Sequence, residues 1–321
     1  MNENHVAVNS GKAFLLAARP KTLSGAVPVM IGVALAIHDM GWERFVTPVA
    51  GDWYRMPLVP ALLCFLFAMV MQVDANFVND YFDCVRGKDD RETRLGPKRA
   101  CTEGWVTLPA MRRCLVVTTA LACLVGLPLV CFGGWEMVLV GAACVLFCFL
   151  YTTLLAQHGM GDVLVLLFFG LVPVCLTYYV TLPPASQTIT AQVVWASLAC
   201  GLVIDTLLVV NNYRDYDQDR AVGKKTLIVR MGRERAEQLY GWLGNIATYM
   251  MWGCLVLGDS SFVLMLVCFA CFVPYALLHG ATRVQMRRIG RGRELNKVLG
   301  MTARNMFVFG VTTAIVTLFI L

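Results

Sequence analysis

Charged residues are scarce in this chain, and their scarcity excludes an ordinary water-soluble globule. Lysine, arginine, aspartate and glutamate make up 15% of its 321 residues, whereas hydrophobic residues make up 58% and the mean hydropathy is +0.65. A typical soluble domain carries about 25% charged residues. The apolar residues form long continuous runs, several near the ~20 residues that a helix needs to cross a bilayer. The sequence also lacks the short alternating segments of a transmembrane β-barrel. We therefore expect an all-α, polytopic membrane protein.

Two other features are missing from the sequence, namely a cleavable signal peptide and a cysteine-based metal or redox centre. The opening MNENHVAVNSGKAFLLAARP contains no apolar core before its first charges, and Arg19 and Pro20 interrupt the first candidate, so we expect the first apolar segment to remain as a membrane helix. The 13 cysteines lie mostly within apolar runs, where they behave as small apolar residues. Cys268 and Cys271 have a CxxC spacing, but no second pair or histidine accompanies them, which argues against a metal or redox centre there.

The apolar runs predict about nine membrane spans in one bundle. Nine crossings place the two termini on opposite sides. One side then collects 25 of the 27 lysines and arginines, and only Arg44 and Arg55 fall on the other. The positive-inside rule makes the basic side, which includes the N-terminus, cytoplasmic. The expected spans are 22–38, 57–78, 111–132, 135–154, 162–181, 191–211, 236–257, 261–281 and 301–321.

Acidic residues are few, and many of them gather in two stretches at the cytoplasmic ends of spans. NDYFDCVRGKDDRE (79–92) contains five acidic residues, and NNYRDYDQDR (211–220) contains three. The first five residues of the two stretches match at three positions, and the stretches lie four spans apart. This predicts an internal repeat within a single domain, with halves at roughly 12–155 and 156–321 and with cytoplasmic cap loops.

Helical spacing places the oxygen atoms of each stretch on a shared face. Like-charged carboxylates at such spacings repel one another, which favours a bound cation. Hard oxygen ligands select Mg²⁺ or Ca²⁺, and Mg²⁺ typically combines one or two carboxylates with phosphate oxygens. Two facing clusters therefore predict two metal ions with a diphosphate between them. The alternative is a pair of solvated helix ends with ordinary charges. The residues spaced three or four apart are Asn76, Asn79, Asp80 and Asp83, and Asn211, Asp215 and Asp219.

Basic residues follow both acidic stretches. A bound diphosphate would use such partners. We expect three or four of them to contact phosphate and the others to mark topology and contact lipid. They are Lys88, Arg91, Lys98 and Arg99 after the first stretch, and Lys224 and Lys225 after the second.

The sequence resembles the UbiA superfamily of intramembrane aromatic prenyltransferases, and within it the menaquinone branch. The resemblance covers nearly the whole chain. Its motifs are RPKTLSGAVPVMIGVALA (19–36), NDYFDCVRGKDDRETRLGPKRA (79–100), YTTLLAQHGMGD (151–162) followed by FFG (168–170), and NNYRDYDQDRAVGKKTLIVRMG (211–232), of which the last is the most specific.

The motifs depart from the general pattern of the superfamily in two places. Gly87 stands where a third carboxylate is usual, and Asp89 and Asp90 come later, a shift that menaquinone-type proteins share. Either could be the third acid. The loop after Tyr151 has only His158, whereas related hydroxybenzoate enzymes often carry a lysine or arginine there.

The resemblance implies an enzyme that transfers a polyprenyl group from a polyprenyl diphosphate to 1,4-dihydroxy-2-naphthoate. The attacked ring carbon bears a carboxylate, so CO₂ is lost and demethylmenaquinone forms. The resemblance further implies two Mg²⁺ ions, a multi-pass place in a bacterial inner membrane, contact with membrane lipid and no nucleic-acid partner. One alternative is a 4-hydroxybenzoate polyprenyltransferase of ubiquinone synthesis. A transporter is another, although its binding site would lie near the bilayer midplane rather than at helix ends.

The same resemblance assigns roles to individual residues. The expected metal ligands are Asn79, Asp80, Asp83, Asp89, Asn211, Asp215 and Asp219. The expected substrate-binding residues are Arg19, Asn76, Lys98, Arg99, Arg214, Lys224 and Lys225. The four aspartates at 80, 83, 215 and 219 count as catalytic, together with Lys225 and Tyr151. Tyr151 either orients the acceptor and stabilises cationic charge through its ring, or packs at the membrane interface.

Two acidic residues lie deeper in the predicted spans. Asp74 precedes Asp80 by six residues, or roughly 9 Å of helix, and Asp205 precedes Asn211 by the same interval. Intramembrane carboxyl groups are costly and usually face a cavity or a partner. Each is expected either to assist proton transfer from the acceptor or to make a hydrogen-bonded contact between helices.

Overall fold

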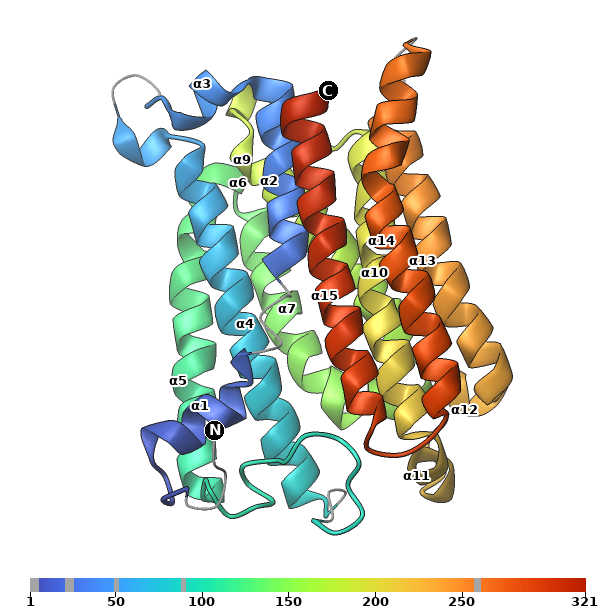
Figure 1. Cartoon of the computed structure of the whole chain (residues 1–321). Coiled ribbons are helices and arrows are strands. Elements are labelled where there is room, and N and C mark those ends of the chain that lie inside the picture. The colour runs from blue at the N-terminus through green and yellow to red at the C-terminus, as the bar shows by residue number, and fades with distance from the viewer. Residues whose placement is uncertain (1–5, 21–25, 49–51, 88–90, 257–260) are drawn as a thin grey trace.

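The computed structural model describes residues 6–20, 26–48, 52–87, 91–256 and 261–321, and within these ranges it is helical and forms no β-strand. This confirms the all-α prediction. Long helices run side by side in one bundle (Figure 1). They are α2 (Val27–Met40), α4 (Leu58–Val85), α5 (Leu108–Gly126), α7 (Glu136–Thr153), α10 (Ala191–Arg214), α13 (Arg233–Leu255), α14 (Phe262–Ile289) and α15 (Leu295–Ile315).

Shorter helical elements connect the long ones or extend them. The short α-helices are α1 (Gly11–Ala18), α3 (Trp42–Val46), α6 (Val130–Gly133), α8 (Gly161–Val165), α9 (Val172–Thr181), α11 (Tyr216–Ala221) and α12 (Leu227–Met231). Single 3₁₀ turns span Trp53–Arg55, Leu127–Leu129, Leu155–His158 and Pro184–Ser186, and π-helical turns span Leu166–Leu171 and Val316–Ile320.

Seven helical stretches in the described part of the chain are long and apolar enough to cross a membrane, which confirms a multi-pass protein. Two further expected spans coincide with helices outside this set. The apolar helix α2 has 14 residues, and α13 opens on a charged turn. The total of nine spans therefore stays a prediction. The seven stretches are Leu58–Val85, Leu108–Gly133, Glu136–Thr153, Gly161–Thr181, Ala191–Arg214, Phe262–Ile289 and Leu295–Ile320.

Helical structure continues beyond the predicted span ends into both acidic stretches. Helix α4 continues to Val85, and α10 continues to Arg214. Asp215 ends α10 and immediately precedes α11, and the Asp219 amide still donates to the Asp215 carbonyl oxygen at 2.8 Å. The spacing of three and four residues is thus realised in space. It directs side chains from α4 and from the α10–α11 junction toward one end of the bundle.

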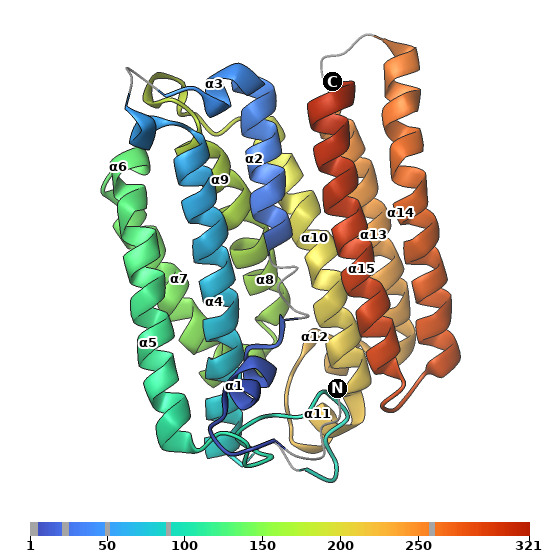
Figure 2. The same ribbon diagram turned by 60° about the vertical axis from the view of Figure 1, so that its left-hand side comes forward.

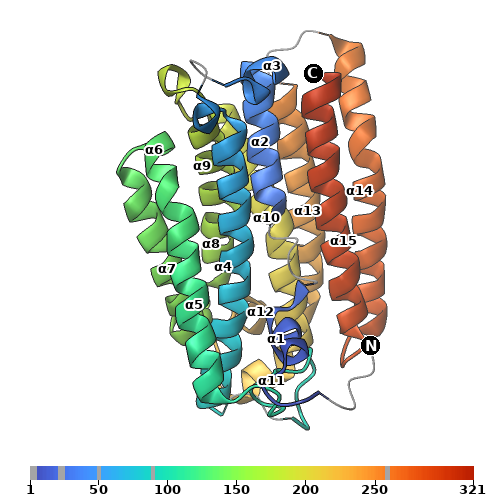
Figure 3. The same ribbon diagram turned by 90° about the vertical axis from the view of Figure 1, so that its left-hand side faces the viewer.

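The two ends of the bundle differ. The short helices α1, α11 and α12 gather at the end that carries the N-terminus, whereas α3 and the C-terminus lie at the other end (Figures 1 and 2). We call the first the capped end. It is covered by α1, α11, α12 and the loop 91–107. Arg44, in α3, belongs to the opposite end, which Figure 3 shows from the side.

A close contact between glycines fixes the middle of the bundle. A Cβ atom on Gly170 would lie 2.9 Å from the Cα of Gly201 and 2.8 Å from the carbonyl oxygen of Ser197, so a larger residue would push the two segments apart. Small residues permit such approach between membrane helices. The contact presses the π-helical turn Leu166–Leu171 against α10. It also sets the position of α8, which precedes that turn.

Candidate active site

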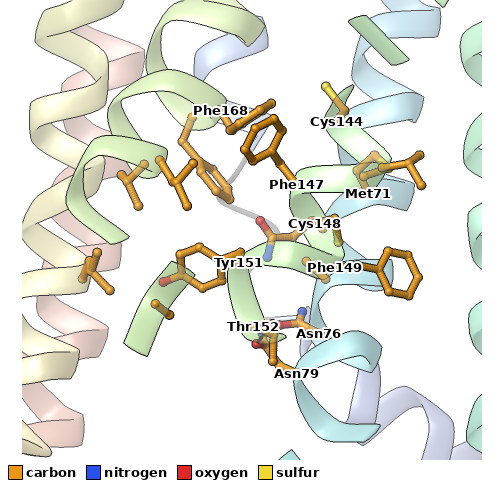
Figure 4. Close-up of a pocket in the computed structure, with 18 of the residues that line it drawn as sticks. Met71, Asn76, Asn79, Cys144, Phe147, Cys148, Phe149, Tyr151, Thr152 and Phe168 are labelled. Atoms are coloured by element: carbon orange, nitrogen blue, oxygen red, sulfur yellow. Dashed lines mark hydrogen bonds between the residues drawn. The ribbon is translucent and has the colours of Figure 1, made fainter. Parts of the chain in front are cut away.

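One large cavity of about 1650 Å³ lies inside the bundle and extends from the capped end toward the opposite end. Its deep part is lined by apolar side chains such as Phe147 and Phe168, whose ring centroids are 5.0 Å apart. Figure 4 shows this ring pair on one side of Tyr151, with Asn76 and Asn79 on the other. The cavity therefore joins an apolar chamber to a polar mouth.

Most of the predicted site residues that the structure describes line this cavity. They come from segments as far apart in sequence as α1 and the loop after α11. Asp80 and Lys98 are not among the lining residues, and Asp89 lies outside the described residues. The predicted residues that line the cavity are Arg19, Asn76, Asn79, Asp83, Arg99, Tyr151, Asn211, Arg214, Asp215, Asp219, Lys224 and Lys225.

The first acidic stretch enters the cavity through Asn79 and Asp83 on the last turns of α4. The guanidinium of Arg99 lies 3.0 Å from the Asp83 carboxylate. The Thr152 hydroxyl on α7 donates to the Asn79 side-chain oxygen at 2.5 Å. Deeper along α4, the Asn76 amide donates to the carbonyl oxygen of Ala18 at 2.9 Å, which ties α4 to α1. These contacts fix two polar side chains of α4 at the mouth.

Asp80 lies elsewhere, although its spacing predicts a place in the metal cluster. Its side chain is fully buried and accepts backbone N–H groups from Ala100 at 2.8 Å and from Cys101 at 2.9 Å. Burial raises the pKa of the Cys101 thiol, and the charge of Asp80 raises it further. Because both oxygens are engaged, Asp80 anchors the loop that carries Arg99 toward Asp83.

The second acidic stretch contributes two carboxylates, each paired with a cation. Both oxygens of Asp215 accept from the Arg214 guanidinium at 2.7 Å. Arg214 also donates to the Asn296 side chain at 2.8 Å. The Lys224 ammonium lies 3.1 Å from Asp219. Burial raises the pKa of Asp219, and the charge of Lys224 acts in the opposite direction. The negative charges at the mouth are thus balanced by neighbouring side chains.

Two of the predicted basic residues, Lys98 and Lys225, differ in their position relative to the cavity. The Lys98 ammonium lies 5.8 Å from the ring centroid of Trp105, so its charge faces that indole rather than the cavity. The Lys225 side chain is exposed at the cavity mouth, and its backbone amide donates to the Gln157 carbonyl oxygen at 3.0 Å. That bond joins the loop after α11 to the segment after Tyr151.

The donor atoms at the mouth suit Mg²⁺ in chemical type. Three carboxylates and two side-chain amides from α4, α10 and α11 line it. Mg²⁺ prefers such oxygen ligands. Among the residues that the structure describes, no group of three or more His, Cys, Asp or Glu side chains is close enough to hold an ion. A bound cation would therefore replace part of the positive charge that Arg99, Arg214 and Lys224 now supply to these carboxylates.

Several residues of the site carry no signal in the sequence pattern. Thr152 follows Tyr151 but belongs to no acidic motif, and Asn296 lies some eighty residues beyond the second acidic stretch. Asp162 is the last residue of the motif YTTLLAQHGMGD, so the sequence pattern indicates the residue but predicts no role for it.

Asp74 accepts hydrogen bonds from the hydroxyls of Thr118 and Thr119, the latter at 2.9 Å, and it lies outside the cavity lining. For Asp74 the contact between helices is therefore the better of the two interpretations.

The apolar part of the cavity reaches the outer surface of the bundle. Leu127, Val138 and Leu146 line the cavity and are 63%, 49% and 55% exposed. They lie on α7 and on the 3₁₀ turn after α5, within stretches that are long and apolar enough to cross a membrane. A long apolar substituent can thus extend from the chamber toward lipid.

Comparison with known proteins places the chain among prenyltransferases. Residues 26–299 match the UbiA prenyltransferase family. The 1,4-dihydroxy-2-naphthoate octaprenyltransferase of Escherichia coli K12 is 31% identical over 280 residues, which cover 84% of this chain and 79% of that protein. The enzyme of the same name from Mycobacterium tuberculosis is 33% identical over 307 residues, covering 92% and 94%.

Solved structures share the fold. A UbiA homolog from Aeropyrum pernix K1 superposes with a TM-score of 0.65 at 15% identity, covering 92% of this chain and 97% of that one. A UbiA homolog from Archaeoglobus fulgidus bound to GPP and Mg²⁺ gives a TM-score of 0.60 at 15% identity, covering 95% and 99%. The helical bundle therefore shares its fold with solved UbiA homologs.

Proposed function

The chain belongs to the UbiA prenyltransferase family, and from this premise we propose that it transfers a polyprenyl group from a polyprenyl diphosphate to 1,4-dihydroxy-2-naphthoate. CO₂ and diphosphate are released, and demethylmenaquinone is the product in its reduced form. The observation that carries this proposal is the 31–33% identity, over most of the chain, to two naphthoate octaprenyltransferases. The cavity supports it, because it combines a charged mouth with an apolar chamber.

The polar mouth suits a diphosphate group. Arg19, Arg99 and Arg214 line it, together with Lys224 and Lys225. Arginine matches phosphate oxygens with two parallel N–H donors, and lysine contributes a compact charge. We assign these five side chains to hold the diphosphate of the substrate and to stabilise it as it leaves. Lys98 is left out, because its charge faces Trp105.

Asp83, Asp215 and Asp219 would hold Mg²⁺, with Asn79 and Asn211 as further oxygen donors. We propose two ions, one at each acidic stretch. A structural relative that was solved with GPP and Mg²⁺ bound supports magnesium as the metal. When bound, Mg²⁺ supplies positive charge that stabilises the departing diphosphate. Asp80 is assigned to anchoring the loop, because both of its oxygens accept backbone N–H groups. Asp89 and Asp90 remain candidates for a third acidic ligand.

The apolar chamber holds the prenyl chain and excludes water from the reacting carbon. An allylic cation is quenched by water, so a dry site favours capture by the aromatic ring. Tyr151 lies between the apolar ring pair and the polar mouth (Figure 4), where its ring can stabilise positive charge on the prenyl group. We place the naphthoate ring beside Tyr151, within reach of that carbon.

We further propose that the protein lies in a bacterial inner membrane with the N-terminus and acidic stretches in the cytoplasm. The basic residues support this orientation through the positive-inside rule. The polyprenyl diphosphate would then present its head group to the cytoplasmic side while its chain stays in lipid.

Membranes that contain the protein test the function directly. They are supplied with a polyprenyl diphosphate and offered 1,4-dihydroxy-2-naphthoate and 4-hydroxybenzoate in parallel, and products are separated by chromatography. We expect a prenylated naphthoquinol with release of CO₂, loss of activity after chelation, and recovery with Mg²⁺. Prenylation of the benzoate alone would reassign the acceptor. Full activity after exhaustive chelation, with no tightly retained metal, would contradict the metal assignment.

A further inference from the structure

Two carboxyl groups, one buried and one half-buried, lie beside the cavity and have no role in the site described so far. Asp205, on α10, is 3% exposed, and its Oδ1 atom has no hydrogen-bond partner among the described residues. Asp162, in the first turn of α8, is half-buried, and its Oδ1 atom is likewise enclosed without a partner in that part of the chain. Ionisable residues inside membrane proteins are costly, and they mark proton or ion pathways. These two groups therefore require a functional explanation.

The position of α8 packs the segment that carries Asp162 against α10. A Cβ atom on Gly161, which adjoins Asp162, would lie 3.2 Å from Cδ2 of Leu208. Leu208 lies three residues after Asp205 and shares its helix face. This contact places Asp162 beside the face of α10 that carries Asp205. Two negative charges repel strongly in a low-dielectric interior, so such a pair is stable when one proton lies between them.

Tyr151 connects this carboxyl pair to the cavity. The same Cβ atom on Gly161 would lie 3.8 Å from the Tyr151 hydroxyl oxygen. A small cavity of about 30 Å³ is enclosed by Tyr151, Asp162 and Lys224, among others, and its size and polar walls suit one water molecule. Figure 4 shows the Tyr151 side chain pointing away from Asn76 and Asn79, toward α10. Its hydroxyl thus lies between the reaction cavity and the pair.

We propose that Asp162 and Asp205 form a proton-holding pair that accepts a proton from the aromatic acceptor through Tyr151 and then returns it. The inference rests on the proposed function. The ring carbon that bears the carboxylate forms a bond to the prenyl carbon. At the same time the bond between the prenyl carbon and the diphosphate oxygen breaks. The adjacent ring hydroxyl then becomes a protonated ketone, which gives its proton to Tyr151 as Tyr151 passes its own to the pair.

Decarboxylation completes the cycle. The bond between the ring carbon and the carboxylate breaks, CO₂ leaves, and its electron pair restores the aromatic ring. The ketone oxygen becomes a hydroxyl again by taking the proton back from the pair. No proton is gained or lost overall, and no oxidant or reductant is needed. A buried pair that can hold the proton briefly suits this sequence better than bulk water, which the chamber must exclude.

Among the described residues, the ionisable groups around the small cavity are Tyr151, Lys224 and Arg230, the last with its guanidinium carbon 3.5 Å from where a Cβ atom on Gly159 would lie. Tyr151 faces it from α7, and Lys224 faces it from the segment between α11 and α12, where its ammonium is engaged by Asp219. Asp83 and Asp219 line the large cavity, where they pair with Arg99 and Lys224. A change in the pH dependence of the reaction after substitution of either member of the pair can therefore be traced to proton transfer at this position.

The test measures kcat against pH for the full chain in lipid vesicles, with saturating dihydroxynaphthoate and polyprenyl diphosphate. Asp162→Asn and Asp205→Asn should each lower kcat about 100-fold near neutral pH, the range expected for loss of a proton acceptor. Their kcat should rise about tenfold per pH unit until the acceptor itself ionises, whereas wild type stays nearly level. A ring-fluorinated acceptor with a more acidic hydroxyl should raise the variants at least about tenfold more than wild type.

Two further variants keep the test decisive. Asp74→Asn removes another buried carboxyl group, one that bonds to Thr118 and Thr119 away from the cavity, and it should keep the wild-type pH profile. Tyr151→Phe leaves both carboxyl groups in place and should reproduce the rising profile, so it decides the matter if either Asn variant does not fold.

Two results would overturn the proposal. One is a wild-type profile in the folded variants of the pair. The other is a lower rate with an unchanged pH slope and no gain from the fluorinated acceptor, which would mean a packing role only. If wild type fails to prenylate the naphthoate at any pH, the proposed function fails first, and this inference with it.

Discussion

Two aspartates three residues apart on α4 have different environments. Asp83 faces the cavity beside Arg99, whereas Asp80 is fully buried and accepts two backbone N–H groups. Charge at Asp83 is available to a ligand, and charge at Asp80 is used by the fold. One motif therefore contains an aspartate whose charge is available to a ligand and an aspartate that stabilises the fold.

We expect Asp83→Asn and Asp215→Asn each to abolish prenyl transfer while the protein stays folded. Both side chains keep their size and one carbonyl oxygen, but each loses the negative charge on which Mg²⁺ affinity depends. The measurement is product formation beside thermal unfolding in detergent. If either variant kept more than about a tenth of wild-type turnover, a cost of under ~1.4 kcal/mol, that aspartate could not be an essential ligand.

Asp80→Asn is the matched comparison and should fail in the opposite way. The side-chain NH₂ of the new asparagine would replace an oxygen that accepts a backbone N–H, so two donors would face each other. This leaves a buried donor unsatisfied, at a cost of about 1–3 kcal/mol. The midpoint of thermal unfolding should fall, and turnover per folded molecule should fall less than in Asp83→Asn. Loss of activity with an unchanged unfolding midpoint would return Asp80 to the metal site.

The elements of the capped end are held together by contacts that no local sequence pattern predicts. The Asn296 amide, in the first turn of α15, donates to the Leu95 carbonyl oxygen at 2.8 Å, and its side-chain oxygen accepts from Arg214. Gln218, on α11, donates to the Thr93 carbonyl oxygen. The loop after α4 is thus bound to both α11 and α15, across the mouth of the cavity.

The sequence predicts the helices and the composition of the site better than it predicts these contacts. Continuous apolar runs and a spacing of three or four residues are local properties, so the bundle and the face that carries Asn79 and Asp83 follow from them. The partners of Asp80 and Arg214 depend on where loops return in space. Asn296 is 82 residues from Arg214, and no spacing rule connects the two. The internal repeat at roughly 12–155 and 156–321 stays a prediction.

Asn296→Ala should weaken the hold of the loop on the mouth. Removing two hydrogen bonds, one of them to a buried guanidinium, should raise KM for the polyprenyl diphosphate about 5- to 10-fold, or ~1–1.4 kcal/mol, with a smaller effect on kcat. Lys297→Ala is the control, because its side chain is 71% exposed and its ammonium lies 3.8 Å from Glu294. An unchanged KM in the Asn296 variant would show that the loop is held without this residue.

At the scale of the whole molecule, charge and termini follow the same axis. The N-terminus lies at the capped end and the C-terminus at the other (Figure 1), and only Arg44 and Arg55 of all lysines and arginines fall on the second side by the predicted topology. In a membrane, this asymmetry favours one orientation over its inverse.

Reporter fusions at each terminus test the orientation. A fusion at the N-terminus should be active only as a cytoplasmic reporter, and one at the C-terminus only as a periplasmic reporter. The physical reason is the cost of moving the basic capped end across the bilayer. Two termini reporting the same compartment would mean that the number of membrane crossings is even.

In a membrane the cavity would border two solvents at once, because its mouth is charged while Leu127, Val138 and Leu146 line its chamber and are exposed on the outer surface of the bundle. Each product therefore has its own way out. Diphosphate partitions into water, and a prenylated quinol partitions into the bilayer, where burial of each CH₂ group gains about 0.8 kcal/mol. The reaction separates its products by phase as it forms them, so accumulation of one in its own solvent does not block the exit of the other.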